Sequence, residues 1–144
     1  MNKVLMLLLL ASSFGLAQSK GGSNAAHRVL IEINSPDHET WDMALRNIAN
    51  LQQAFGTDHI EIEAVVLGKG IDLVLGSDAE YADRLGALSR GGVTFAACQN
   101  TMRQRHIAKQ DLLPFVVTVD SGVAELVRKQ EAGWVLSKNR LVSL

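Results

Sequence analysis

The stretch that decides the fold is Val93-Thr-Phe-Ala-Ala-Cys98-Gln-Asn-Thr-Met-Arg-Gln-Arg-His-Ile107. Its first part, 93–97, is an apolar run typical of a buried strand, and polar, helix-compatible residues follow Cys98 at once. In an open α/β sheet, ligands and reactive side chains collect where a strand gives way to a helix. Cys98, the only cysteine among 144 residues, stands at such a junction. The stretch therefore predicts both a fold class and a candidate site.

Outward from this stretch, strand patterns and helix patterns alternate. Apolar residues at helical spacing predict a helix over 36–55, capped by Ser35, with Pro36 in its first turn. Two further helices are expected to begin at Ser77 or Asp78 and at Asp120 or Ser121, with a short helix near 71–75 and another near 100–106. The strands are expected at 28–33, 60–67, 93–97, 115–119 and 134–136. This alternation predicts an α/β fold with a parallel sheet and helices on both faces.

Composition favours one packed domain and argues against nucleic-acid binding. Hydrophobic residues make up 47% of the chain, which is enough for a core, and the formal net charge is −1. Without a basic surplus or basic residues interleaved with aromatics, nucleic acid is not an expected partner.

The N-terminal residues are expected to direct export. A positive start at Lys3, an apolar run over 4–16 and small residues before position 18 predict a secretory signal peptide at 1–17. The alternative is an uncleaved anchor, but the apolar run is short for a bilayer span. A polar, Gly/Ser-rich linker follows at 18–27, and the domain occupies 28–144. The expected location is periplasmic or secreted, with no stable membrane anchor after cleavage.

The ends of parallel strands predict a rim that binds ligands. Because these ends meet at one edge of the sheet, the residues after the second, third and fourth strands are expected to lie together. Apart from the cysteine, the expected rim residues are Gly68, Lys69, Gly70, Gln99, Asn100, Thr101, Ser121 and Gly122.

Cys98 has two readings from its position alone. If a helix begins near Asn100 or Thr101, its backbone N–H groups and dipole lower the pKa of the thiol, and Arg103, Arg105 and His106 add positive potential. The thiolate would then be the catalytic nucleophile. The alternative is a buried, inert cysteine that packs as a small apolar residue. Burial of the thiol under a helix would favour the second reading.

The sequence lacks the motifs that mark nucleotide-binding, metal-binding and hydrolase sites. Gly68-Lys-Gly70 has neither the phosphate-binding P-loop sequence nor the dinucleotide fingerprint. The four histidines are dispersed, so no metal site is expected, and no cofactor is implied. No Gly-x-Ser-x-Gly sequence marks a hydrolase.

Taken together, several motifs resemble the DsrE/DsrF-like family, in its exported single-domain branch. The resemblance covers about 28–136 and rests on these segments: Val65-Val-Leu-Gly-Lys-Gly-Ile-Asp-Leu-Val-Leu75, Phe95-Ala-Ala-Cys98-Gln-Asn-Thr-Met102, Ile107, Asp111-Leu-Leu-Pro114, Val119-x-Ser-Gly-Val-Ala-Glu-Leu126 and Gln130-x-x-Gly-Trp134. It implies a three-layer α/β/α sandwich with a mainly parallel five-stranded sheet. It also implies homo-oligomers, often trimers or hexamers.

In sulfur-relay members of that family, a cysteine in this region carries a persulfide. The resemblance therefore implies a sulfur carrier or sulfurtransferase-like relay component, with Cys98 as the carrier and a sulfur donor or acceptor protein as partner. Some relatives have a second cysteine three residues on, where this chain has Thr101. The alternative is a non-catalytic oligomeric module that binds a small ligand or a protein, with Cys98 structural. A third reading is a periplasmic thiol sensor, which needs a partner cysteine from another chain. Whether the protein is an enzyme stays open.

Overall fold

The computed structural model describes residues 25–137. The expected signal peptide at 1–17 and most of the expected linker lie outside these residues. The first strand begins at His27, one residue before the expected strand start. No helix within the described part of the chain is long and apolar enough to cross a membrane.

The centre of the molecule is a parallel sheet of five strands in the order β4-β3-β2-β1-β5. The strands are β1 (His27–Ile33), β2 (Ile60–Val66), β3 (Val93–Cys98), β4 (Val117–Val119) and β5 (Val135–Ser137). All four neighbouring pairs run parallel. The carboxyl ends of the strands therefore lie at one edge of the sheet, as the sequence predicts.

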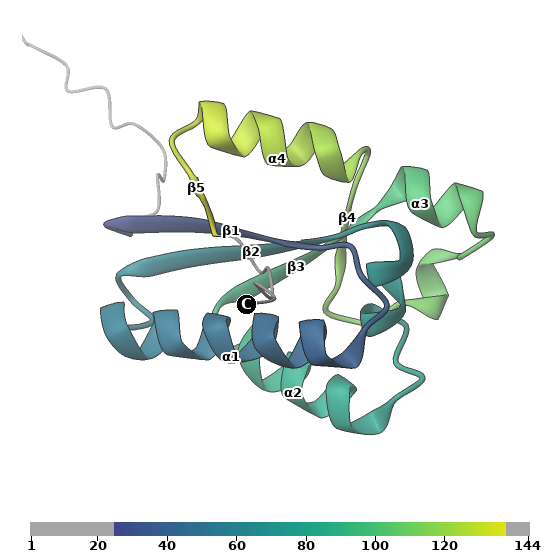
Figure 1. Ribbon diagram of the computed structural model, residues 1–144, viewed down its shortest axis with the longest axis horizontal. Helices are drawn as coiled ribbons and strands as arrows, with labels where there is room; N and C mark the ends of the chain where they lie inside the picture. The colour runs from purple at the N-terminus through teal and green to yellow at the C-terminus, as the bar shows by residue number, and fades with distance from the viewer. Residues whose placement is uncertain (1–24, 138–144) are drawn as a thin grey trace, which may run out of the picture.

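Helices cover both faces of this sheet, which makes three layers (Figure 1). On one face lie α1 (His38–Phe55) and α2 (Ala79–Arg90), and on the other lies α4 (Gly122–Glu131). The short helix α3 (Gln99–Gln104) follows β3 at the carboxyl edge. Two 3₁₀ helices, η1 (Gly68–Val74) and η2 (Lys109–Asp111), complete the connections. The α/β class and the three-layer arrangement are both confirmed.

The core is divided by the sheet into a large and a small cluster. The large one packs α1 and α2 against the sheet and contains Ile48 and Phe95, both almost fully buried. The small one lies beneath α4 and includes Leu30 and Leu126. Because helices cover both faces of the sheet, the central strands are rich in apolar residues, although β2 also carries Glu61 and Glu63.

Several element boundaries differ from the sequence-based expectation, and two of the differences have a clear physical cause. Helix α1 begins at His38, and its N-cap is Asp37, whose Oδ2 accepts hydrogen bonds from the Thr40 N–H and hydroxyl, both at 2.9 Å. The expected cap, Ser35, is wrong, because its hydroxyl instead accepts the Asp37 N–H at 3.1 Å. Strand β4 begins at Val117 rather than at Phe115, since the chain still turns there: the Val116 N–H binds the Leu113 carbonyl at 3.0 Å.

Candidate functional site: a thiol between two helix N-termini

Cys98 is both the last residue of β3 and the N-cap of α3. In the register of β3 with β4, Cys98 lies beside Val119, so the next helix, α4, starts close to it. The Gly122 N–H, in the first turn of α4, donates a hydrogen bond to Cys98 Sγ at 3.1 Å. Cys98 is only 4% exposed. The thiol therefore lies beneath the first turn of α4 at the carboxyl edge of the sheet.

Several hydrogen-bond donors converge on this sulfur. Burial is the largest single influence and raises the pKa of the Cys98 thiol. Hydrogen bonds from the backbone of Gly122, the backbone and hydroxyl of Thr101 and the backbone of Asn100 act in the opposite direction. Together these donors outweigh desolvation and hold the pKa of Cys98 below its ordinary value. The arrangement stabilises a thiolate, the reactive form of cysteine.

The close approach of α4 to the thiol requires glycine at position 122. A Cβ added to Gly122 would lie 3.2 Å from the Cβ atoms of Cys98 and Leu67 and 3.3 Å from Cγ1 of Val65. Each contact is tighter than ordinary van der Waals packing, so a side chain here would push α4 away from the sheet. The absence of that side chain lets the Gly122 N–H reach the sulfur.

Thr101 connects the thiol to the end of β2. Its side chain is 94% buried, since the residue is 6% exposed, and its Oγ1 accepts the Gly68 N–H at 2.9 Å. The same hydroxyl acts as a donor toward Cys98. One hydroxyl thus links the turn after β2 to the thiol after β3, a role that the position of Thr101 in the sequence does not reveal.

The other predicted rim residues occupy the same edge but point to different partners. The Gln99 side chain donates to the Thr118 hydroxyl at 3.0 Å, and the Asn100 side chain binds Arg103. The Ser121 hydroxyl accepts the Ala124 N–H at 3.4 Å and caps α4. Lys69 is exposed. These side chains shape the edge without contacting the sulfur in this structure.

Gly70 has a packing role at the end of β1. A Cβ at this position would lie 2.3 Å from the carbonyl oxygen of Ile33. The backbone of η1 therefore lies directly against the end of β1. Glycine at 70 holds the Gly68–Gly70 turn in place beside Thr101.

Both arginines that closely follow Cys98 in the sequence bind nearby side chains. Arg105 forms an ion pair with Asp72 at 2.8 Å, and Arg103 binds the Asn100 side chain. His106 is exposed. The lowered pKa of Cys98 is accounted for by hydrogen bonds, not by these charges.

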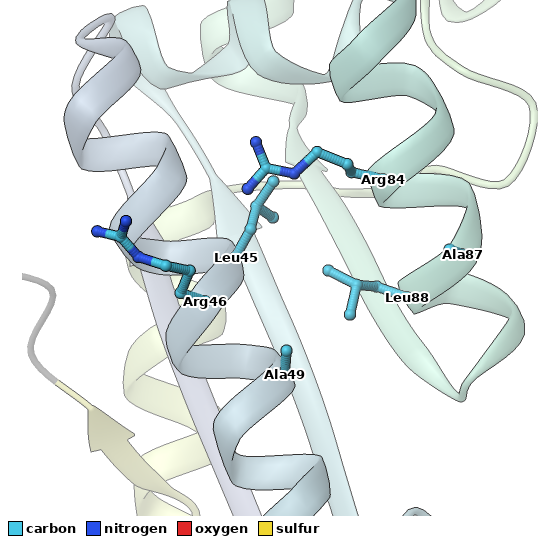
Figure 2. Close-up of a pocket in the computed structure, with 6 residues that line it drawn as sticks. All are labelled: Leu45, Arg46, Ala49, Arg84, Ala87 and Leu88. Carbon is cyan, nitrogen blue, oxygen red and sulfur yellow. The ribbon is translucent and has the colours of Figure 1, made fainter.

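A separate hollow lies on the other face of the sheet, between α1 and α2 (Figure 2). It has a volume of about 260 Å³ and an apolar floor that includes Leu45 and Leu88. Arg84 reaches across it and pairs with Asp42 at 2.5 Å, whereas Arg46 points away from it (Figure 2). This hollow is distinct from the thiol site. Within residues 25–137, no cluster of His, Cys, Asp and Glu is suited to hold a metal ion.

The fold and the site define a class of protein: a three-layer α/β/α domain that holds one stabilised thiol at the carboxyl edge of a parallel sheet. The model of the DsrE/DsrF-like family matches residues 27–137. The chain belongs to the DsrE/DsrF-like family.

Solved structures agree with this assignment. MTH1491 from Methanobacterium thermoautotrophicum, a protein of unknown function, is 32% identical with a TM-score of 0.73, and the match covers 77% of this chain and 97% of that one. BT1422 from Bacteroides thetaiotaomicron, also of unknown function, is 16% identical with a TM-score of 0.63, covering 81% and 97%. The ychN protein from E. coli is 17% identical with a TM-score of 0.63, covering 78% and 99%. The last two support the fold alone. No curated protein matches the chain.

Proposed function

We propose that this protein is a single-cysteine sulfur carrier in which Cys98 holds sulfane sulfur as a persulfide. The observation that carries the proposal is the set of hydrogen-bond donors that lower the pKa of the Cys98 thiol although it is buried. A cysteine with only a packing role gains nothing from such donors, and burial alone raises its pKa. Membership of the DsrE/DsrF-like family supports the same chemistry.

In the loading step, the Cys98 thiolate attacks the outer sulfur of a persulfide on a donor protein. A bond forms between Cys98 Sγ and that sulfur, the S–S bond of the donor breaks, and the donor leaves as a thiolate. Cys98 then carries the S–SH group, and no oxidant or reductant is consumed. The donors from Gly122, Thr101 and Asn100 stabilise the negative charge before the attack and again when Cys98 leaves as a thiolate during unloading.

In this proposal, sulfur transfer requires a donor and an acceptor from other molecules. Because the chain has one cysteine, an internal dithiol step is excluded, and Thr101 occupies the place of a second thiol with its hydroxyl bound to Gly68. Donor and acceptor thiols must therefore come from other molecules. We further propose that the protein works as a homo-oligomer, a trimer or hexamer, in the periplasm or outside the cell after cleavage of the signal peptide at 1–17.

Transfer between proteins requires access to the sulfur. Cys98 is 4% exposed beneath the start of α4, so the proposal includes movement of the first turn of α4 when a partner binds. This turn is held by the Gly122 hydrogen bond and the Ser121 cap, and an ion pair between Asp120 and Arg128 at 2.6 Å joins the residue before the cap to the helix. The proposed movement breaks these contacts and leaves the apolar cluster around Leu126 packed.

The test is mass spectrometry of the intact protein after incubation with a persulfide donor. The wild-type chain should gain about 32 Da, one sulfur atom, which a thiol reductant removes. Cys98→Ser is the matched control and should gain nothing. Equal gains in both proteins, or none in the wild type, would overturn the proposal.

A second candidate function is a non-catalytic binding module in which Cys98 is structural, and the 4% exposure of Cys98 favours it. The two candidates differ in how the native protein reacts with iodoacetamide. A carrier whose α4 turn opens reacts much faster than the protein unfolds, and its rate rises with pH through a midpoint below that of an ordinary thiol. A structural cysteine reacts only at the rate of global unfolding.

A further inference from the structure

An open groove runs along the edge of the molecule between α1 and β5, away from the thiol. It consists of two adjoining hollows with volumes of about 440 and 380 Å³. Leu51 and Ser137 line both hollows, so the two are continuous. Its α1 wall includes Asn47, Leu51 and Ala54, which lie four and three residues apart and so share one side of the helix.

The groove carries two large apolar side chains that are exposed. Phe55 and Val135 both line it and are 41% and 65% exposed. Val135 belongs to β5, which is an edge strand of three residues. Large exposed apolar side chains around a hollow mark a surface that another segment covers.

We propose that residues 138–144 of this chain bind in this groove and cover it. The segment continues directly from Ser137, which lines both hollows. Its sequence is Lys-Asn-Arg-Leu-Val-Ser-Leu, with apolar side chains at Leu141, Val142 and Leu144. Three apolar residues placed just after the groove fit its exposed apolar walls.

Length and composition both favour this occupant. Seven extended residues span about 23 Å, whereas the α1 wall from position 47 to position 55 is about 12 Å long. The segment is therefore long enough to follow the groove. The residues that come shortly before Ala26 in the sequence, 18–24, read Gln-Ser-Lys-Gly-Gly-Ser-Asn and have no large apolar side chain to fit such a groove.

Cross-linking tests the position of the segment directly. In a Cys98→Ser background the chain has no cysteine, so Ala54→Cys with Val142→Cys forms the only pair. Ala49→Cys with Val142→Cys is the matched control, because Ala49 is an exposed alanine of the same helix that lines the hollow facing α2 (Figure 2). Under mild oxidation, we expect the first pair to form an intramolecular disulfide at least about tenfold faster than the control pair.

The rate of the first pair should not depend on protein concentration. Equal rates for the two pairs would overturn the proposal, because a segment bound in the groove holds position 142 nearer to position 54 than to position 49. Cross-linked dimers whose yield rises with concentration would also overturn it and would assign the groove to a second copy of the chain. The outcome does not depend on Cys98 and so is independent of the proposed sulfur carriage.

A second measurement uses an apolar fluorescent dye on the full chain. Leu141→Ser with Leu144→Ser should increase dye binding and lower the melting temperature, since the groove is then uncovered. Lys138→Ser with Arg140→Ser changes the same segment but keeps its apolar residues, and it should leave both values unchanged. If the two double variants behave alike, the apolar side chains do not occupy the groove and the proposal fails.

Discussion

At the scale of single residues, the Cys98 sulfur is held by polar contacts inside an apolar environment. Burial opposes ionisation, yet hydrogen bonds from two successive helices reverse its effect and lower the pKa of the thiol. Thr101 matters most among the side chains, because its hydroxyl serves both the sulfur and the Gly68 N–H. Removing that hydroxyl changes two hydrogen bonds at once.

Thr101→Val should raise the pKa of Cys98, because the thiolate loses the hydroxyl donor. It should also lower the free energy of unfolding by about 1–3 kcal/mol, since the Gly68 N–H loses its partner. Thr101→Ser keeps the hydroxyl and is the control. The rate of alkylation measured against pH reports the first effect, and urea denaturation reports the second. An unchanged midpoint in Thr101→Val would contradict the role of the hydroxyl.

The lowered pKa also predicts how stability depends on pH. The folded protein binds the thiol proton less tightly than the unfolded chain, so ionisation of Cys98 stabilises the fold. This contribution is complete above the ordinary pKa of a thiol, about 8.5, and is lost as the pH falls through the lowered pKa. The stability of the wild type relative to Cys98→Ser should therefore rise from pH 6 to about pH 9. A difference that falls with pH would contradict the assignment.

At the scale of elements, the first turn of α4 covers the thiol. Its cap, Ser121, accepts one hydrogen bond at 3.4 Å, and the Gly122 N–H rests on the sulfur. Local opening of this turn, as the proposed transfer requires, breaks these hydrogen bonds and the packing of Gly122 against Leu67 and Val65, while the rest of the helix stays packed through Leu126.

Ser121→Ala should weaken this turn by about 1 kcal/mol, which corresponds to about a fivefold increase in its open fraction. The rate of native alkylation at Cys98 should increase by the same factor. Asp37→Ala is the matched control, because it removes the cap of α1 on the other face of the sheet. If both variants accelerate alkylation equally, the reaction follows global unfolding and not opening of α4.

At the scale of the whole molecule, α4 is the helix that covers one face of the sheet within the described part of the chain (Figure 1). Besides its small apolar cluster, it is attached by an ion pair between Lys129 Nζ and Glu63 Oε2 at 2.7 Å. The Glu63 side chain is 7% exposed, and the Lys129 ammonium lies 4.2 Å from the centre of the Trp134 ring. A buried carboxylate thus fixes the helix over β2.

Lys129→Met should lower the free energy of unfolding by about 3 kcal/mol, because Glu63 is left buried without its counter-ion. Adding Glu63→Leu to Lys129→Met should recover most of this loss, since no buried charge then remains. Urea denaturation at one fixed protein concentration measures both. A double variant as unstable as the single one would show that the ion pair is not what attaches α4.

Much of this architecture could be predicted from the chain itself. The alternation of apolar strand runs with amphipathic helices determines the parallel α/β sheet, and the sharp change of pattern at Cys98 places the thiol at its carboxyl edge. The predicted helix cap was wrong where two neighbouring side chains compete for the same role. Asp37, not Ser35, caps α1, because two side chains able to cap stand within three residues and only the folded turn selects between them.

The burial of the Cys98 thiol and its lowered pKa depend on the tertiary structure. The donors to Cys98 come from residues 100, 101 and 122, and the last of these is 24 positions away in the chain. Sequence spacing does not encode how near α4 approaches β3, because that distance depends on the absent side chain at Gly122 and on packing against Leu67 and Val65. The sequence by itself determined the sheet, its helices and a single cysteine at the strand end. The packing of α4 buried that cysteine and contributed to the lowering of its pKa, since hydrogen bonds between distant segments form only in the complete fold.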